Sequence, residues 1–208
     1  MYICTSSDIM AGYILIVASM VAFASSLPLT PSPAQLPFIY YNKIDWGAQP
    51  ARGGSELSLP VPYAVIHHSY IPGACFNFEE CQQSMRWMQN FHMDTQGWTD
   101  IGYNFAVGSD GAVYEGRGWH TVGAHAFGYN VQSIGIVLIG DWVSNLPPPK
   151  QLQAVQELIA VGVKLGYISS NYHVIGHRQV AATECPGESL YQEISSWDRF
   201  LKHVPTKM

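Results

Sequence analysis

Hydrophobic and polar positions alternate along the chain in a way that predicts several short strands. Residues 63–66 form an apolar run that leads into His67-His68-Ser69, as expected for a buried strand that ends in polar side chains. Residues 103–107 and 112–114 are two apolar runs on either side of Gly108-Ser109-Asp110-Gly111, which favours a hairpin. Residues 134–139 are apolar on both faces, which indicates a strand near the centre of a sheet.

Three other segments repeat apolar residues at helical spacing. The first begins near Asn77, with Glu80 three positions later, and runs to about Phe91. The second spans 152–163 after three prolines and ends at Gly166, and the third is marked by residues 190–197. Residues 173–177 predict a brief strand or loop. Together these elements predict a single α/β domain with a central mixed β-sheet flanked by about three helices, in a strand order that the pattern does not determine.

The first 37 residues differ from the rest of the chain. Residues 11–24 are an uncharged apolar stretch, shorter than the roughly 20 residues that span a bilayer. They end in Ala22-Phe23-Ala24, typical of a cleavage site, although no Lys or Arg precedes them. We therefore expect a cleaved signal peptide over 1–26, a Pro-rich linker over 27–37, a folded domain over 38–208 and secretion. A retained membrane anchor and an intracellular isoform are the alternatives.

Composition excludes two classes of protein. Hydrophobic residues make up 48% of the 208 residues and charged residues 12%, which is too apolar for an intrinsically disordered chain. The formal net charge is −5, so the basic surface of a nucleic-acid-binding protein is not expected.

The cysteines limit the chemistry further. Cys4 would leave with the signal peptide, and Cys75 and Cys81 are close enough in sequence to close a small loop in an oxidising compartment. Cys185 is then unpaired, and either metal ligation or burial as an inert thiol accounts for it. His67, His177 and Cys185 would form a set of two imidazoles and one thiolate suited to Zn²⁺, with a fourth position open to water as in catalytic zinc sites.

Several motifs occur in one order along residues 44–200. They are Val65-Ile66-His67-His68-Ser69, Gly102-Tyr103-Asn104-Phe105, Tyr114-Glu115-Gly116-Arg117-Gly118-Trp119, Gly123-Ala124-His125, Gly135-Ile136, Gly176-His177-Arg178 and Thr183-Glu184-Cys185-Pro186-Gly187. In these motifs the chain resembles the peptidoglycan recognition protein family, which is related to phage-type zinc amidases. It is most similar to the amidase-active LB type of insects.

The resemblance implies both a fold and a reaction. The family has a mixed sheet, flanking helices and a groove for a muramyl peptide. Its amidases hydrolyse the amide between the lactyl group of N-acetylmuramic acid and L-alanine. By matching position, His67, His177 and Cys185 would hold zinc, Tyr103 and Thr183 would be catalytic, and Cys75 and Cys81 would form a disulfide. Non-catalytic receptors of the family have Ser in place of Cys185, so Cys185 favours catalysis.

The resemblance also implies a ligand class. Gly97-Trp98 together with Arg117 goes with diaminopimelate-type stems, because a guanidinium can bind the extra carboxylate of diaminopimelate through two charge-assisted hydrogen bonds. The remaining groove residues carried over by position are His68, Ser69, His92, His125 and Asn130.

We therefore expect a secreted zinc amidase that binds bacterial peptidoglycan and muropeptides and damps an immune response. We expect no nucleic-acid partner and no stable membrane insertion. A receptor that binds without cutting, and a docking protein held in a membrane by its apolar N-terminus, are the alternatives.

Overall fold

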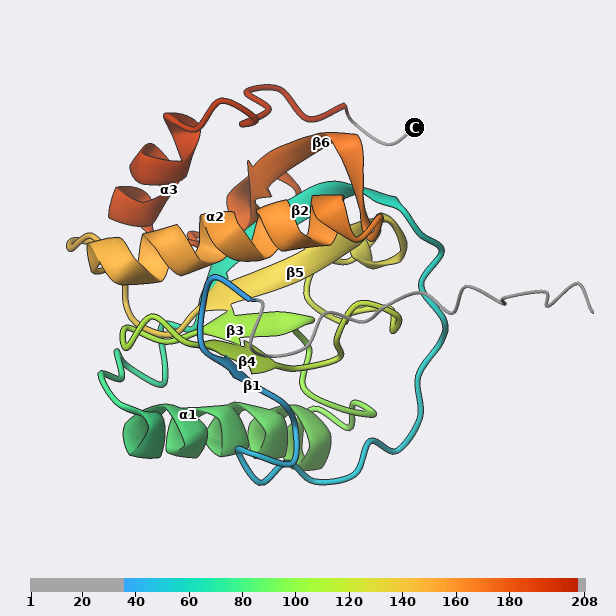
Figure 1. Cartoon of the computed structure of the whole chain (residues 1–208), viewed down its shortest axis with the longest axis vertical. Coiled ribbons are helices and arrows are strands. Elements are labelled where there is room, and N and C mark those ends of the chain that lie inside the picture. The colour runs from blue at the N-terminus through green and yellow to red at the C-terminus, as the bar shows by residue number, and fades with distance from the viewer. Residues whose placement is uncertain (1–35, 206–208) are drawn as a thin grey trace, which may run out of the picture. The chain divides into compact units, whose positions relative to one another are not determined.

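The computed structural model describes residues 36–205, in which a six-stranded mixed sheet is flanked by three α-helices (Figure 1). The sheet order is β1-β4-β3-β5-β2-β6. In chain order the strands and α-helices are β1 (Tyr40–Tyr41), β2 (Val61–His68), α1 (Phe78–Asn90), β3 (Phe105–Val107), β4 (Val113–Glu115), β5 (Ser133–Leu138), α2 (Pro149–Lys164), β6 (Ile168–Gly176) and α3 (Glu188–Ser195). A π-helix over Phe91–Thr95 extends α1, and 3₁₀ turns cover Asn130–Gln132 and His177–Gln179. The expected fold class is confirmed.

Strand pairing places the ends of distant segments together. β2 lies between β5 and β6 and is parallel to both, and β5 is also parallel to β3. Among the strands of residues 36–205, β3 and β4 form the one antiparallel pair, which confirms the predicted hairpin. All six residues of β5 are buried, in agreement with its predicted central position. Parallel neighbours end at the same edge of a sheet, so the loops after β2 and β6 meet there.

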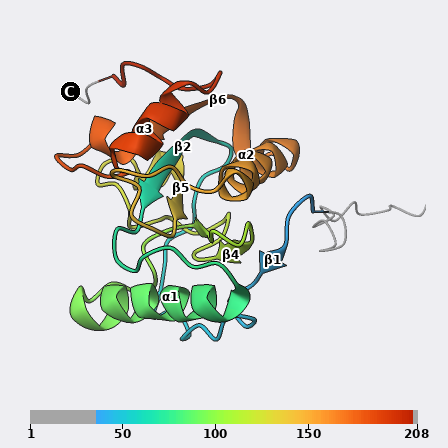
Figure 2. The same cartoon turned by 90° about the vertical axis from the view of Figure 1, so that its left-hand side faces the viewer.

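The helices cover the two faces of the sheet. α2 and α3 pack on one face through a core that includes Leu158, Leu190 and Ile194, and α1 packs on the other through Met85 and Met88 (Figures 1 and 2). Each fully buried apolar side chain of this size stabilises the fold by roughly 1.5–3 kcal/mol. The apolar repeat seen along each helix therefore predicts the face that it buries.

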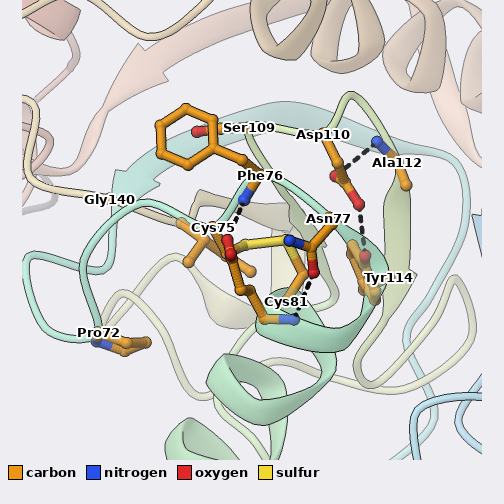
Figure 3. Close-up of a disulfide and its surroundings, with 12 residues drawn as sticks. Pro72, Cys75, Phe76, Asn77, Cys81, Ser109, Asp110, Ala112, Tyr114 and Gly140 are labelled. Carbon is orange, nitrogen blue, oxygen red and sulfur yellow. Dashed lines mark hydrogen bonds between the residues drawn. A yellow bond between two sulfur atoms is a disulfide. The ribbon is translucent and has the colours of Figure 1, made fainter.

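The start of α1 is secured by a cap and a disulfide (Figure 3). The side-chain oxygen of Asn77 accepts a hydrogen bond from the backbone N–H of Glu80, at 3.0 Å, as the sequence predicted. Cys75 and Cys81 form a disulfide across the same turn. A Cβ added to Gly108 would lie 2.6 Å from the sulfur of Cys81, so the hairpin loop packs tightly against this bridge.

Two strands differ from the prediction. β1 has only two residues and was not predicted, and β6 extends over nine residues where a brief strand or loop was expected. The signal peptide, Cys4 and nearly all of the linker lie outside the described residues. Within residues 36–205, no helix has the length and apolar character needed to cross a bilayer.

Candidate functional site

Three predicted ligands converge at the edge where β2 and β6 end. Ile66 of β2 pairs with Gly176 of β6, so His67 and His177 follow directly from paired positions. The centroids of their rings are 4.4 Å apart. Residues 110 positions apart in sequence are therefore brought together by parallel strand pairing.

Cys185 reaches the same point from the loop between β6 and α3. Its carbonyl accepts a hydrogen bond from the backbone N–H of Arg178, at 2.8 Å, and its own N–H donates to the hydroxyl of Thr183. The Arg178 side chain also bonds the Glu184 carbonyl and forms an ion pair with Glu188. These contacts hold the loop back against the 3₁₀ turn and place the Cys185 sulfur 3.7 Å from Nδ1 of His67.

The three side chains fit a metal ion. The ligand atoms of His67, His177 and Cys185 all lie within 4.8 Å of one another. Among residues 36–205, no fourth His, Cys, Asp or Glu joins this group. In a tetrahedral zinc site, metal–nitrogen and metal–sulfur bonds of about 2.0 and 2.3 Å separate neighbouring ligand atoms by roughly 3.3–3.5 Å. A small inward movement of the ligands meets that requirement, and three ligands leave one coordination position for water or substrate.

Burial sets the protonation of these ligands. It lowers the pKa of His67 well below its usual range, and the neighbouring imidazoles of His125 and His177 lower it further. Burial also lowers the pKa of His177, so both imidazoles are neutral at pH 7, as metal ligands must be. Burial raises the pKa of the Cys185 thiol to about 12 despite the nearby Arg178, so binding of a cation would displace its proton.

A pocket of about 570 Å³ opens beside the three ligands. Six predicted site residues line it, from three separate parts of the chain: His68, Ser69, Tyr103, His177, Thr183 and Cys185. Burial raises the pKa of Tyr103 above its ordinary value, and the nearby Cys185 adds to this, so the phenol stays protonated and can donate a hydrogen bond. The Tyr103 ring lies 5.2 Å from that of His67.

Two pocket residues are already bonded to the backbone. The Ser69 hydroxyl donates to the carbonyl of Pro72 and accepts from the N–H of Gly140. Nδ1 of His68 accepts from the N–H of Trp142 at 3.3 Å. Both residues therefore shape the rim of the pocket through the loop that follows β5.

A second group of predicted residues lies next to Tyr103 but does not line this pocket. His92 stacks on Trp98 with ring centroids 4.7 Å apart and contacts Tyr103 edge-on at 5.7 Å. Gly97 adopts a φ of +70°, a conformation that glycine favours and that turns the chain towards Trp98. The rings of Trp98, His92 and Tyr103 thus form a continuous aromatic wall.

Arg117 hydrogen-bonds the backbone of the segment that leads to Tyr103. Its guanidinium donates to the carbonyls of Ile101 and Val122 at 2.7 and 2.9 Å, and more weakly to that of Asp100. Three of its five N–H donors thus hold the backbone, which leaves two for a ligand.

The structure gives His125 and Asn130 contacts within the protein. The Asn130 side-chain oxygen accepts from the N–H groups of His125 and Ala126. His125 is only 8% exposed and lies 3.0 Å from His67, on the side away from the cysteine. His125 therefore lies behind His67, and neither His125 nor Asn130 is among the residues that line the pocket.

Sequence reasoning missed several pocket-lining residues, namely Tyr70, Asp141, Val143, Ser144 and Glu184. Asp141 comes two positions after the strongest predicted strand. The tendency of sites to form in loops after parallel strands could have identified it.

In this mixed α/β domain two imidazoles and a thiol lie beside an open pocket, an arrangement suited to a hydrolase that holds a metal ion. The family profile described as N-acetylmuramoyl-L-alanine amidase matches residues 57–188, and the chain belongs to this family. The resemblance inferred from the motifs is thereby confirmed.

Individual relatives support the same assignment. Peptidoglycan-recognition protein LB of Drosophila melanogaster is 52% identical over 159 residues, which is 76% of this chain and 68% of that protein. An N-acetylmuramoyl-L-alanine amidase of Sus scrofa is 48% identical over 162 residues, but the match spans only 27% of its length.

Solved structures agree. Wild-type Drosophila PGRP-LB superimposes with a TM-score of 0.78 at 50% identity, covering 80% of this chain and 98% of that one. Peptidoglycan recognition protein LE in complex with tracheal cytotoxin, a monomeric diaminopimelic acid-type peptidoglycan, has a TM-score of 0.76 at 43% identity, covering 77% and 94%.

Proposed function

We propose that the protein is a zinc-dependent amidase that hydrolyses the bond between N-acetylmuramic acid and L-alanine in peptidoglycan fragments. The observation that carries this proposal is the convergence of His67, His177 and Cys185 beside a pocket lined by Tyr103. Family membership supports the same reaction.

The donor set fits zinc and assigns tasks to the chain's own residues. His67, His177 and Cys185 would hold the ion, which supplies Lewis acidity when bound. The protonated Tyr103 hydroxyl donates a hydrogen bond to the oxygen of the scissile carbonyl or to the attacking water. Loss of a donor to a developing oxyanion typically costs about 3–4 kcal/mol. Thr183, which also accepts the Cys185 N–H, places its hydroxyl at the pocket edge for the same substrate group.

The reaction is tested by mass spectrometry of a diaminopimelate-type muropeptide incubated with the zinc-loaded protein. We expect two products, the sugar lactyl acid and the free stem peptide, whose masses sum to that of the substrate plus one water. A chelator should stop product formation and added zinc should restore it. Intact substrate under these conditions would instead favour the non-catalytic receptor.

Cys185→Ser tests the metal set directly. A hydroxyl is a far poorer zinc ligand than a thiolate, so cleavage should fall to background while the muropeptide still binds. His120→Asn, which alters an exposed imidazole outside the site, is the matched control and should cleave normally. Cleavage by Cys185→Ser at the normal rate would refute the enzyme.

Diaminopimelate-type fragments are the proposed substrate class. Arg117 has two N–H donors left for a carboxylate, next to the Trp98–His92 stack. The similar structure of peptidoglycan recognition protein LE bound to tracheal cytotoxin supports this preference.

We also propose that the protein is secreted and removes immune-eliciting fragments, which would reduce innate immune signalling. The disulfide Cys75–Cys81 supports an oxidising compartment. N-terminal sequencing of the mature protein tests secretion, since an intact Met1 in a membrane fraction would contradict it. A reporter-cell assay that compares digested and intact muropeptides tests the signalling role, and equal responses would contradict it.

A further inference from the structure

The imidazole of His125 lies directly behind His67 and is not used by the reaction described above. Its Nδ1 atom is 3.0 Å from Nε2 of His67, and the two rings meet edge-on with centroids 5.0 Å apart. Both rings are buried, at 8% and 1% exposure. His125 is therefore placed to act on the far nitrogen of a ligand.

The two nitrogens of His67 have different neighbours. Nδ1 faces the Cys185 sulfur at 3.7 Å, whereas Nε2 faces His125. A nitrogen that binds a metal must present its lone pair, so the single proton of a neutral His67 has to lie on Nε2. In that tautomer the Nε2–H group donates to Nδ1 of His125.

The hydrogen-bond chain continues beyond His125 in the same direction. With Nδ1 as acceptor, a neutral His125 carries its proton on Nε2, which lies 3.4 Å from the hydroxyl oxygen of Ser133. The Ser133 hydroxyl donates in turn to the carbonyl of Tyr129 at 2.7 Å. Each member donates to the next, and the chain ends on a backbone carbonyl, which can only accept.

The surrounding backbone is shaped to hold this imidazole. A Cβ added to Gly123 or Gly135 would lie 2.4 or 2.3 Å from Cδ2 of the His125 ring, so glycine at both positions makes the slot for it. Asn130 fixes the His125 backbone by accepting its N–H at 2.9 Å. Three separate segments thus position a side chain that does not line the pocket.

We propose that His125 is a positioning residue that holds His67 in the tautomer and orientation in which Nδ1 binds the metal. This inference rests on the proposed function in that His67 is taken as a zinc ligand. Partners of this kind typically change metal affinity about 10–100-fold when they are removed.

Two substitutions distinguish the loss of the hydrogen-bond acceptor from the change in side-chain shape. His125→Leu fills much of the slot without an acceptor, whereas His125→Asn places an amide oxygen where Nδ1 stood. We expect about a 10–100-fold weaker zinc affinity for His125→Leu, measured by competition with a chromophoric chelator, and a much smaller loss for His125→Asn. His120→Leu is the control for an exposed imidazole and should bind zinc normally.

Long-range ¹H–¹⁵N NMR of the histidine rings provides a readout that needs neither zinc nor substrate. In the metal-free wild type, His67 and His125 should both be Nε2–H tautomers. In His125→Leu, His67 should become a mixture. An Nδ1–H tautomer of His67 in the metal-free wild type would overturn the proposal.

Two further outcomes are decisive. Unchanged zinc affinity in His125→Leu overturns the proposal, as does an equal loss in both variants when their metal-free unfolding temperatures match the wild type. If His125→Leu does not fold, the histidine tautomers of the metal-free wild type still test the proposal. A wild type that binds no zinc but shows both Nε2–H tautomers would contradict the proposed metal function while supporting the hydrogen-bond chain.

Discussion

Tyr103 is the residue that should separate substrate binding from turnover. Its hydroxyl makes no hydrogen bond within residues 36–205, although the side chain lines the pocket beside His177 and Cys185. Its loss would therefore leave no protein group unsatisfied. We therefore expect the Tyr103 hydroxyl to contribute through a contact that it makes only when substrate is bound.

Tyr103→Phe should keep the fold and zinc affinity but lose about 10²–10⁴-fold in turnover, because a proton donor at the reacting group is removed. Steady-state rates with a fixed muropeptide measure the loss, and calorimetry measures zinc binding. Undiminished turnover would reject a catalytic role for this phenol.

Arg117 combines a structural and a binding task, and a substitution has to separate them. Arg117→Ala would leave the carbonyls of Ile101 and Val122 without their donor, at a cost of about 1–3 kcal/mol if they stay buried. Any effect of Arg117→Ala on ligand binding would then be confounded by a shift of the aromatic wall. The milder Arg117→Lys keeps the charge and loses the planar fork.

We expect Arg117→Lys to weaken the binding of diaminopimelate-type fragments by about tenfold while lysine-type fragments change little, since only the former offer the extra carboxylate. Titration calorimetry with a matched pair of fragments measures this. Arg52→Lys, at an exposed ion pair with Asp94, is the control. An equal loss on both fragments would remove Arg117 from the specificity argument.

At the scale of elements, the disulfide and the cap of α1 stabilise the same turn. Cys75 and Cys81 are six positions apart, and closing so small a loop in the unfolded chain contributes about 2 kcal/mol in the chain-entropy model. The Asn77 cap persists without the bridge, because its hydrogen bond to the Glu80 N–H involves neither cysteine. The two effects should therefore be separable.

The double variant Cys75→Ala, Cys81→Ala should lose about 2 kcal/mol of unfolding free energy and remain folded. Urea titration with a reductant-treated wild type as reference checks this, since both samples should unfold at similar urea concentrations. A double variant as stable as the oxidised wild type would show that the bridge constrains nothing.

Regular elements were predicted from the sequence where the apolar pattern is local and strong. The three helices and β2 to β5 all fall in this group. β1 has only two residues, which is too few to show an alternating pattern. β6 lies at the edge of the sheet and includes the polar residues Ser169, Ser170 and Asn171, so its sequence lacks the apolar run that predicts a strand. Strand order depends on pairing between distant segments, which no local pattern records.

The candidate site was predicted mainly from motifs and not from spacing. His67 and His177 could be brought together only by the parallel pairing of β2 with β6, which the sequence does not show. The position of His125 behind His67 was likewise invisible, because it depends on the gaps left by Gly123 and Gly135. Motifs therefore supplied the candidate residues, while the structure supplied their arrangement.

At the scale of the whole molecule, buried neutral imidazoles make the metal-free protein sensitive to acid. Burial lowers the pKa of His92 from 6.5 to about 4 and that of His125 to about 3, and it also lowers those of His67 and His177. Below pH 6.5 the unfolded chain binds protons that the folded chain does not, so stability is full above this pH and is lost as the pH falls towards 4.

His92 offers a clean test because its ring can be replaced without losing its backbone contact. Its Nδ1 accepts the N–H of Gly102 at 3.1 Å, and the amide oxygen of His92→Asn can accept the same hydrogen. The His92 pKa, lowered from 6.5 to about 4, corresponds to about 3 kcal/mol lost between pH 7.5 and 4, and His92→Asn should remove that part of the pH dependence. Urea unfolding of both proteins with chelator present, over this pH range, measures the difference. Parallel stability curves would show that His92 titrates alike in the folded and unfolded chains, and acid sensitivity would then have to come from the other imidazoles.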